Sequence, residues 1–168
     1  SLRLKLQTYA NTLYAFPCII VLCFSLDSPT PQSVREGGKH LILTDQAIDE
    51  NKAAVPMILA IGAINSKLIN LGIRGFTSIN VRTGEALDTH SSAVLLGVGA
   101  TTINPYIAFD SIYQRYEKNL FGKFNFEECI KRYVHSLDNG LLKIMSKMGI
   151  SVLSAYRGGC NFESVGLS

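Results

Sequence analysis

The side chains best suited to chemistry follow a β-prone run at residues 76–81. Arg82, Thr83 and Glu85 come directly after it, and His90 stands five residues beyond Glu85. A carboxylate and an imidazole can work together as general acid and base. The five-residue spacing puts Glu85 and His90 on adjoining rather than identical helix faces, and helix capping with surface charge explains both residues as well. An acid–base pair and a structural role are therefore both open for this loop.

A second candidate is the glycine turn at residues 156–161, YRGGCN. Glycines between a strand and a helix can cradle a phosphate through backbone N–H groups, and Arg157 would add a fork of donors. Neither a GxGxxG nor a Walker pattern is present, so the motif is weak. Arg157, Gly158 and Gly159 thus predict either an anion site or a structural turn at a domain interface.

The cysteines and histidines show no metal-ligand spacing. They are dispersed, without a CxxC pair, and the cysteines lie in apolar or helical surroundings. We expect buried, reduced thiols in a cytoplasmic protein, and no metal or cofactor held by this segment. The residues concerned are Cys18, Cys23, Cys129, Cys160, His40, His90 and His135.

Length and composition indicate a folded domain. The chain has 168 residues, of which 47% are hydrophobic and 17% charged, with a net charge of +3. These fractions suit a buried α/β core and exclude a disordered chain. The positive charge is mild and no Lys/Arg stripe alternates with aromatic residues, so nucleic acid is not an expected partner.

The first 32 residues are predicted to be a leader of uncertain fold, ahead of an incomplete α/β domain at 33–168. The apolar run 15–24 superficially resembles a signal peptide, but it is far short of the ~20 residues of a membrane-spanning helix. Its β-branched residues favour a buried strand that ends at a proline turn. A secretory or membrane-attached product is the alternative, and we expect no membrane association.

Strands and helices alternate through the rest of the chain. Thr83 is a candidate cap for the helix after 76–81, and Asn125 with Glu128 has capping-box spacing. Predicted strands are 41–44, 76–81, 98–103 and 150–155, and predicted helices are 56–71, 85–97, 106–120 and 125–148. Such alternation is typical of α/β folds with parallel strands. Because a closed barrel takes ~250 residues, we predict a partial (β/α) barrel-like domain.

Longer stretches carry a family resemblance. They run in the order REGGKHLILTD, VPMILAIGAINSKLINLGIR, FTSINVRTGE, LDTH, VLLGVGATTINPYIAFDSI, GLLKIMSKMGIS, YRGG and NFESVGLS. Together they closely resemble the central domain of the large chain of bacterial glutamate synthase, over roughly residues 34–168. A family segment is absent between Pro31 and Val34, so a truncated domain is expected.

The resemblance implies a function for the parent enzyme. Glutamate synthase makes two glutamates from glutamine and 2-oxoglutarate with electrons from NADPH or ferredoxin. An amidotransferase domain releases ammonia, which travels to a barrel domain that carries FMN and a [3Fe–4S] cluster. The central domain lies between these two domains, and the resemblance implies no catalytic residues within it. The expected partners are these two domains of the same chain, with an NADPH-dependent small subunit as a further candidate.

Two hypotheses of different classes follow. In the first, the chain is a fragment of glutamate synthase that acts as a scaffold between the glutaminase and FMN synthase sites. In the second, it is an autonomous small α/β domain that binds a phosphate-like anion at Arg157, Gly158 and Gly159.

Overall fold

The computed structural model describes residues 18–22, 34–46, 53–159, 161–163 and 165–166. Its centre is a parallel sheet of four strands in the order β1-β2-β3-β4. The strands are β1 (Cys18–Leu22), β2 (His40–Thr44), β3 (Ser78–Arg82) and β4 (Thr102–Asn104). Neighbours in the sheet are neighbours in the chain, as in a (β/α) barrel and unlike a doubly wound sheet, whose strand order reverses. The α/β fold with parallel strands is confirmed.

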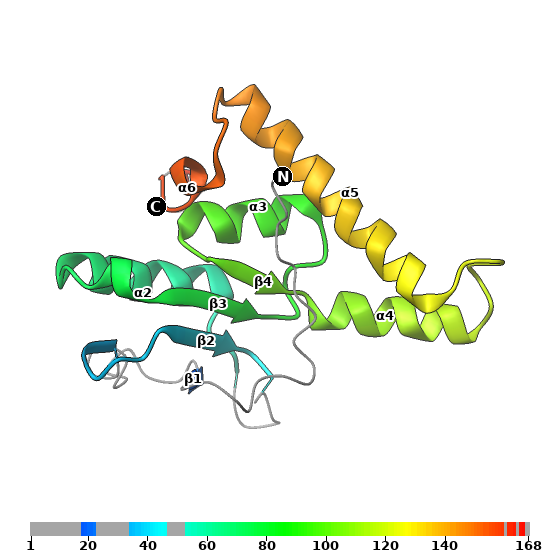
Figure 1. Ribbon diagram of the computed structural model, residues 1–168, viewed down its shortest axis with the longest axis horizontal. Helices are drawn as coiled ribbons and strands as arrows, with labels where there is room; N and C mark the ends of the chain where they lie inside the picture. Colours follow the sequence, from blue (N-terminus) through cyan, green and yellow to red (C-terminus); the bar gives the residue numbers. More distant parts are fainter. Residues whose placement is uncertain (1–17, 23–33, 47–52, 160, 164, 167–168) are drawn as a thin grey trace.

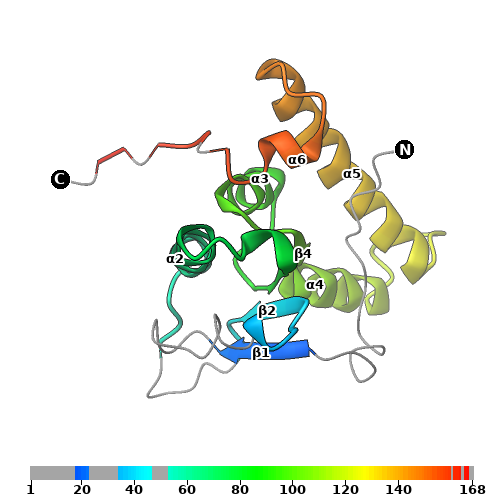
Figure 2. The same ribbon diagram turned by 60° about the vertical axis from the view of Figure 1, so that its left-hand side comes forward.

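Helices α2 (Met57–Asn70) and α3 (Thr89–Val98) connect successive strands and cover one face of the sheet, as Figures 1 and 2 show. Because strand side chains alternate between faces, every second residue of β2, β3 and β4 points into this core. These strand residues join helix residues in one buried cluster, which includes Leu41, Leu43, Ile79, Val81, Ile103, Met57, Ile61, Leu68 and Leu96.

The other face of β2, β3 and β4 is mostly polar, with Ile42 as its apolar residue. His40 and Ser78 share a hydrogen bond of 2.7 Å between Nδ1 and Oγ, and Thr102 donates to Asn80 Oδ1 at 2.7 Å. The apolar run 41–44 predicted a strand covered on both faces, whereas only Leu41 and Leu43 are fully buried. The reason is that the residues of β3 and β4 on this face, such as Ser78, Asn80 and Thr102, are polar. They form hydrogen bonds instead of packing into an apolar core.

Helices α4 (Tyr106–Glu117) and α5 (Phe126–Lys147) form a hairpin beyond the ends of the strands. Figure 1 shows α4 continuing away from β4, and α5 running back past α3. The face of α5 that meets α3 and α4 buries Cys129, Leu137, Leu141 and Met145. Cys129 is a free thiol, as expected, while the other three cysteine side chains lie outside the described part of the chain.

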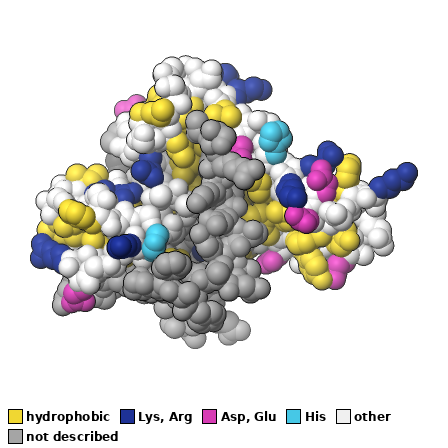
Figure 3. Space-filling model, in the orientation of Figure 1, with side chains coloured by type: hydrophobic (Ala, Val, Ile, Leu, Met, Phe, Trp, Pro, Cys, Tyr) yellow, Lys and Arg dark blue, Asp and Glu magenta, His cyan; other side chains and the backbone are white. Residues whose placement is uncertain are grey.

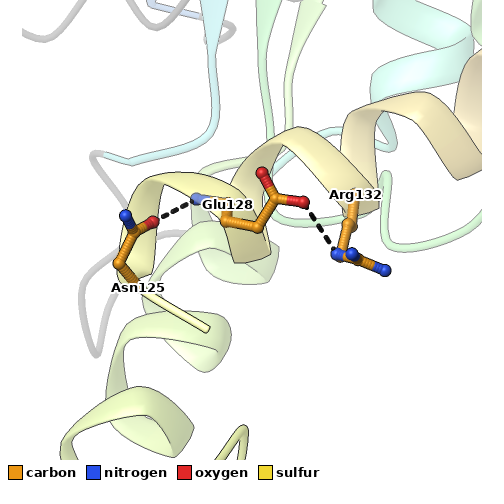
Figure 4. Close-up of polar contacts among 3 residues, drawn as sticks. All are labelled: Asn125, Glu128 and Arg132. Carbon is orange, nitrogen blue, oxygen red and sulfur yellow. Dashed lines mark hydrogen bonds and ion pairs between the residues drawn. The ribbon is translucent and has the colours of Figure 1, made fainter. Parts of the chain in front are cut away.

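The start of α5 follows its sequence signature. Asn125 Oδ1 accepts a hydrogen bond of 2.8 Å from the backbone N–H of Glu128, and the Glu128 carboxylate pairs with Arg132 at 2.9 Å (Figure 4). The capping interaction satisfies one of the backbone donors that a helix leaves free in its first turn. The predicted cap at Asn125 is confirmed.

The strand predicted at 150–155 is wrong. Gly149, at φ +72°, ends α5, and the N–H of Ile150 then bonds to the carbonyl of Met145. A short helix, α6 (Leu153–Tyr156), follows, and the Tyr156 hydroxyl donates to the Ala93 carbonyl at 3.0 Å. Burial of the whole Tyr156 side chain against α3 overrides the local β propensity.

The other predicted elements are present, with bounds shifted by a few residues. The run 15–24 is described only at β1, which pairs in parallel with β2. The domain division at residues 32/33 stays a prediction. No helix among the described residues is long and apolar enough to span a membrane.

Candidate functional site

Parallel strands bring the loops that follow them to one edge of the sheet, where α/β proteins keep their sites. We call this the carboxyl edge. Here it consists of Asp45 after β2, Arg82, Thr83 and Gly84 at the end of β3, and Asn104 and Tyr106 at the end of β4. The short bond from Thr83 N to the Asn104 carbonyl, 3.1 Å, joins the last two strand ends.

Asp45 ties the ends of β2 and β3 together. Its Oδ2 accepts two hydrogen bonds, one of 2.6 Å from the Thr83 hydroxyl and one of 2.9 Å from the Gly84 backbone N–H. The Asp45 residue is only 7% exposed and Thr83 is fully buried. Charge-assisted bonds of this kind are strong, so the loops after β2 and β3 are fixed relative to each other.

Arg82 and Tyr106 stack beside this pair. The Arg82 guanidinium carbon lies 5.7 Å from the centre of the Tyr106 ring, within range of a cation–π contact. Burial, together with the negative charge of Asp45, raises the pKa of the Tyr106 hydroxyl, which therefore stays protonated at neutral pH. The tyrosine is a hydrogen-bond donor here and not a base.

Glu85 has a structural partner. Both of its carboxylate oxygens accept from the backbone N–H of Met57, at 3.2 and 3.0 Å, so Glu85 caps the start of α2. His90 lies on α3 and meets Phe162 edge-to-face at 6.4 Å between ring centres. The two residues thus have different neighbours, and a catalytic role for either stays a prediction.

The predicted cap at Thr83 is wrong. Helix α3 begins at Thr89, and its cap is Asp88, whose Oδ1 accepts from the Ser91 N–H at 2.7 Å. The Thr83 hydroxyl instead accepts a hydrogen bond of 3.1 Å from the backbone N–H of Glu85 and donates one to Asp45. Thr83 bonds to the buried carboxylate of Asp45 in another loop, and the local spacing of residues could not reveal this contact.

The glycine turn lies at the opposite, amino edge of the sheet. Gly158 adjoins the Asn65 side chain, and Asn65 Oδ1 accepts from Arg74 Nε at 2.7 Å. Arg74 also donates to the carbonyls of Thr77 and Gly99, at the starts of β3 and β4. Arg157, Gly158 and Gly159 were expected beyond a strand end, but the loss of strand 150–155 moves them here.

Arg74 is the hub of this amino edge. Burial, and secondarily the positive charge of Arg157, lowers the pKa of Arg74, although the guanidinium remains charged at any physiological pH. An anion site at Arg157 stays a prediction.

Sequence reasoning missed the residues that organise both edges. Asp45 and Asn104 are each the residue that follows a predicted strand, 41–44 and 98–103. Arg74 carried no motif at all. Among the described residues no group of three or more His, Cys, Asp or Glu side chains could hold a metal ion.

The face of the described residues that Figure 3 draws carries charges of both signs. On the face drawn in Figure 3, basic and acidic side chains are interspersed and hydrophobic ones lie over the α4–α5 hairpin. Exposed apolar side chains in that hairpin include Ile107, Tyr113, Leu120 and Phe124.

Comparison with known proteins gives consistent matches. Residues 23–168 match the family model described as glutamate synthase central domain. The glutamate synthase [NADPH] large chain of Azospirillum brasilense is 55% identical over 83% of this chain and 9% of its own length. The corresponding large chain of Bacillus subtilis is 39% identical over 82% and 9%. The ferredoxin-dependent glutamate synthase of Pyropia yezoensis is 40% identical over 81% and 10%.

Proposed function

The chain belongs to the glutamate synthase family, in its central domain, and we propose from this membership that it is a scaffold between the glutaminase and FMN synthase sites of such an enzyme. The chain spans about a tenth of the length of the curated relatives it matches. The activity of the whole protein, glutamine plus 2-oxoglutarate to two glutamates, is therefore part of the proposal.

The relatives use different electron donors. Their names specify NADPH, ferredoxin or NADH, and each matches more than four-fifths of this chain. A segment shared by all three kinds is not expected to choose the donor. In the proposal, FMN and the [3Fe–4S] cluster belong to a neighbouring barrel domain of the parent chain, an NADPH-dependent small subunit is a further partner, and the enzyme is cytoplasmic.

The observation that supports a scaffold most is the use made of the carboxyl edge. Asp45 holds Thr83 and Gly84, and Glu85 holds the start of α2 through Met57. Carboxylates that an enzyme of this fold would keep available for proton transfer are here engaged in tying loops together. Loops fixed in this way suit a rigid connecting element.

Rigidity has a physical purpose in this proposal. Ammonia released at one site becomes protonated, or escapes, if it reaches bulk water. Two distant sites therefore need an enclosed connection whose walls keep their relative positions. A packed α/β segment supplies such walls because close-packed interiors deform little.

The experiment is a cofactor and activity assay on the purified 168-residue chain. We expect no flavin absorbance after mixing with FMN and gel filtration, and no glutamate formation from ammonium, 2-oxoglutarate and reductant. Stoichiometric FMN, or turnover by the chain unaided, would contradict the scaffold proposal.

A further inference from the structure

The α4–α5 hairpin carries an apolar surface that the described part of the chain leaves uncovered. Helix α4 has twelve residues, and Ala108 is the only one of them that is buried. A helix of a globular protein normally buries a stripe of side chains along its length. The turn between the two helices lies away from the sheet, at the far end of the hairpin (Figure 1).

We call residues 113–124, at this far end, the tip. Four large apolar side chains of the tip are exposed, by 48% for Tyr113, 36% for Tyr116, 66% for Leu120 and 44% for Phe124. We call these four side chains the tip patch. Single apolar side chains are common on protein surfaces, but several gathered on one projecting element indicate an interaction site.

The tyrosines of the tip patch are held in place within the chain itself. The centre of the Phe126 ring lies 5.5 Å from that of Tyr113 and 5.9 Å from that of Tyr116. Tyrosine is enriched among the residues that contribute most to protein interfaces. Rings that are already fixed lose little conformational entropy when a partner covers them, so they suit a docking surface.

Leu120 is presented by the way α4 ends. Asn119, at φ +55°, reverses the chain, and the N–H of Leu120 bonds to the Arg115 carbonyl at 3.1 Å. In such a helix end, the residue at the Leu120 position frequently packs on an apolar side chain at the Arg115 position. Because that position holds an arginine here, Leu120 stays two-thirds exposed.

The unpaired charges of the tip are positive. Among the described residues, the side chains of Arg115, Lys118 and Lys123 form no ion pair or hydrogen bond, and we call them the tip cations. Glu117 is the one acidic residue in 113–124. It is engaged by the Tyr113 hydroxyl, whose pKa it raises through a hydrogen bond and through its negative charge.

The acidic residues next to the tip are also engaged. At the start of α5, Glu127 pairs with Lys131 at 2.8 Å and Glu128 pairs with Arg132 at 2.9 Å. These pairs lie within one helix, so they leave the tip cations without an acidic partner. A surface that complements the tip therefore has an apolar centre with carboxylates around it.

The length of the relatives indicates where such a surface lies. This chain corresponds to 9–10% of the length of each glutamate synthase it was compared with above, so about nine-tenths of such an enzyme lies outside it. A surface on the same polypeptide has a high effective concentration, which favours it over a separate molecule. A second copy docked tip to tip would instead bring two sets of tip cations together.

We propose that the tip docks on an acidic surface of the parent enzyme's own polypeptide, outside these 168 residues, with the tip patch buried at the contact and the tip cations paired with carboxylates around it. This inference rests on the scaffold proposal in placing the segment inside a complete enzyme. It deepens that proposal because it assigns the contact to one element and states the chemistry of the partner.

The test is zero-length carbodiimide crosslinking of a complete glutamate synthase whose central segment is this chain, followed by mass spectrometry of the peptides. The reagent joins a lysine amine to a carboxylate only where the two groups are in contact. We expect links from Lys118 or Lys123 to Asp or Glu residues of the same polypeptide outside the 168 residues. An absence of links from both lysines would overturn the proposal, whether the tip is then bare or covered by nucleic acid.

Isotope labelling identifies a second copy. Labelled and unlabelled enzymes are mixed before crosslinking, and we expect the links to join peptides of the same label. Links between a labelled and an unlabelled peptide would show that a second copy is the occupant, which would also overturn the proposal.

Two exposed leucines supply matched variants of the complete enzyme. Leu120→Asp puts a negative charge into the tip patch and alters neither lysine, so it should reduce the links about tenfold. Leu142→Asp, on α5 at a leucine that is 41% exposed, should leave them unchanged. Because both leucines are exposed, both variants should fold. Equal numbers of links in the two variants would contradict docking through the tip patch.

The crosslinks are measured independently of turnover, so the docking and the scaffold can fail separately. Absence of links in an enzyme whose Gly140→Ala variant hydrolyses excess glutamine would overturn the docking and leave the scaffold. Links in an enzyme whose Gly140→Ala variant consumes glutamine and 2-oxoglutarate equally would overturn the scaffold and leave the docking.

Discussion

Replacement of Arg74 by alanine is expected to lower the free energy of unfolding by about 3 kcal/mol, because it removes three hydrogen bonds made by one charged group. Arg74 donates hydrogen bonds of 2.7 Å to the Asn65 side chain on α2, 2.7 Å to the Thr77 carbonyl and 2.9 Å to the Gly99 carbonyl. Its loss would leave a largely buried Asn65 and two backbone carbonyls without their partner. Urea unfolding of the 168-residue chain measures the change.

Two variants control this prediction. Arg74→Lys keeps the charge but presents a single ammonium, which cannot reproduce the planar fork of a guanidinium, so most of the loss should remain. Arg115→Ala removes an exposed arginine from α4 and should change stability by no more than ~0.5 kcal/mol. If Arg74→Ala unfolds like Arg115→Ala, the proposed hub at the amino edge is wrong.

Gly140→Ala should destabilise the chain by about 2 kcal/mol, the opposite of its effect in an open helix. Gly to Ala inside a helix normally adds ~1 kcal/mol of stability. Here an added Cβ would lie 2.6 Å from Thr89 Oγ1 and 3.1 Å from Thr89 Cβ, and still closer to Cγ2. Thr89 is short and β-branched, so it cannot swing away, and overpacking of this kind typically costs ~1–3 kcal/mol.

A double-mutant cycle isolates the contact. Thr89→Ala removes the hydroxyl and methyl groups that a new Cβ would meet, so the Thr89→Ala/Gly140→Ala chain should regain most of the loss. Ser136→Ala, on an exposed position of the same helix, should be neutral or slightly stabilising. Greater stability of Gly140→Ala than of the parent chain would show that α3 and α5 do not approach closely there.

Local chemistry predicted the elements well. Pro56 directly precedes α2, Asn125 caps α5 and Gly149 follows its end, because each of these effects depends on residues close in sequence. Apolar residues recur along 130–148 with a helical period, and Leu137, Leu141 and Met145 among them are buried on α5, whereas Met148 is exposed.

Long-range contacts account for what could not be predicted. The β-prone residues after Gly149 form α6 because Tyr156 reaches the Ala93 carbonyl, 63 residues away in sequence. Thr83 turns to Asp45, which lies 38 residues earlier, instead of capping α3. Neither contact leaves a signal in local spacing, so the organisation of both edges of the sheet emerged only from the structure.

Contacts that hold one element against another are common to these results. The amino edge is held by Arg74, the carboxyl edge by Asp45, and the α3–α5 contact by the absence of a side chain at Gly140. Each of these contacts holds one element against another and is made by a single residue. A spacer between two active sites needs this property more than it needs catalytic groups.

The most direct measurement is the coupling ratio of a complete glutamate synthase whose central segment is this chain. Glutamine consumed is compared with 2-oxoglutarate converted, for the parent sequence and for Gly140→Ala at a temperature where both remain folded. The scaffold proposal predicts equal amounts for the parent, and for the variant an excess of glutamine hydrolysis while synthesis from added ammonium persists. Equal amounts in both proteins, or loss of synthesis from ammonium in step with loss of coupling, would contradict it.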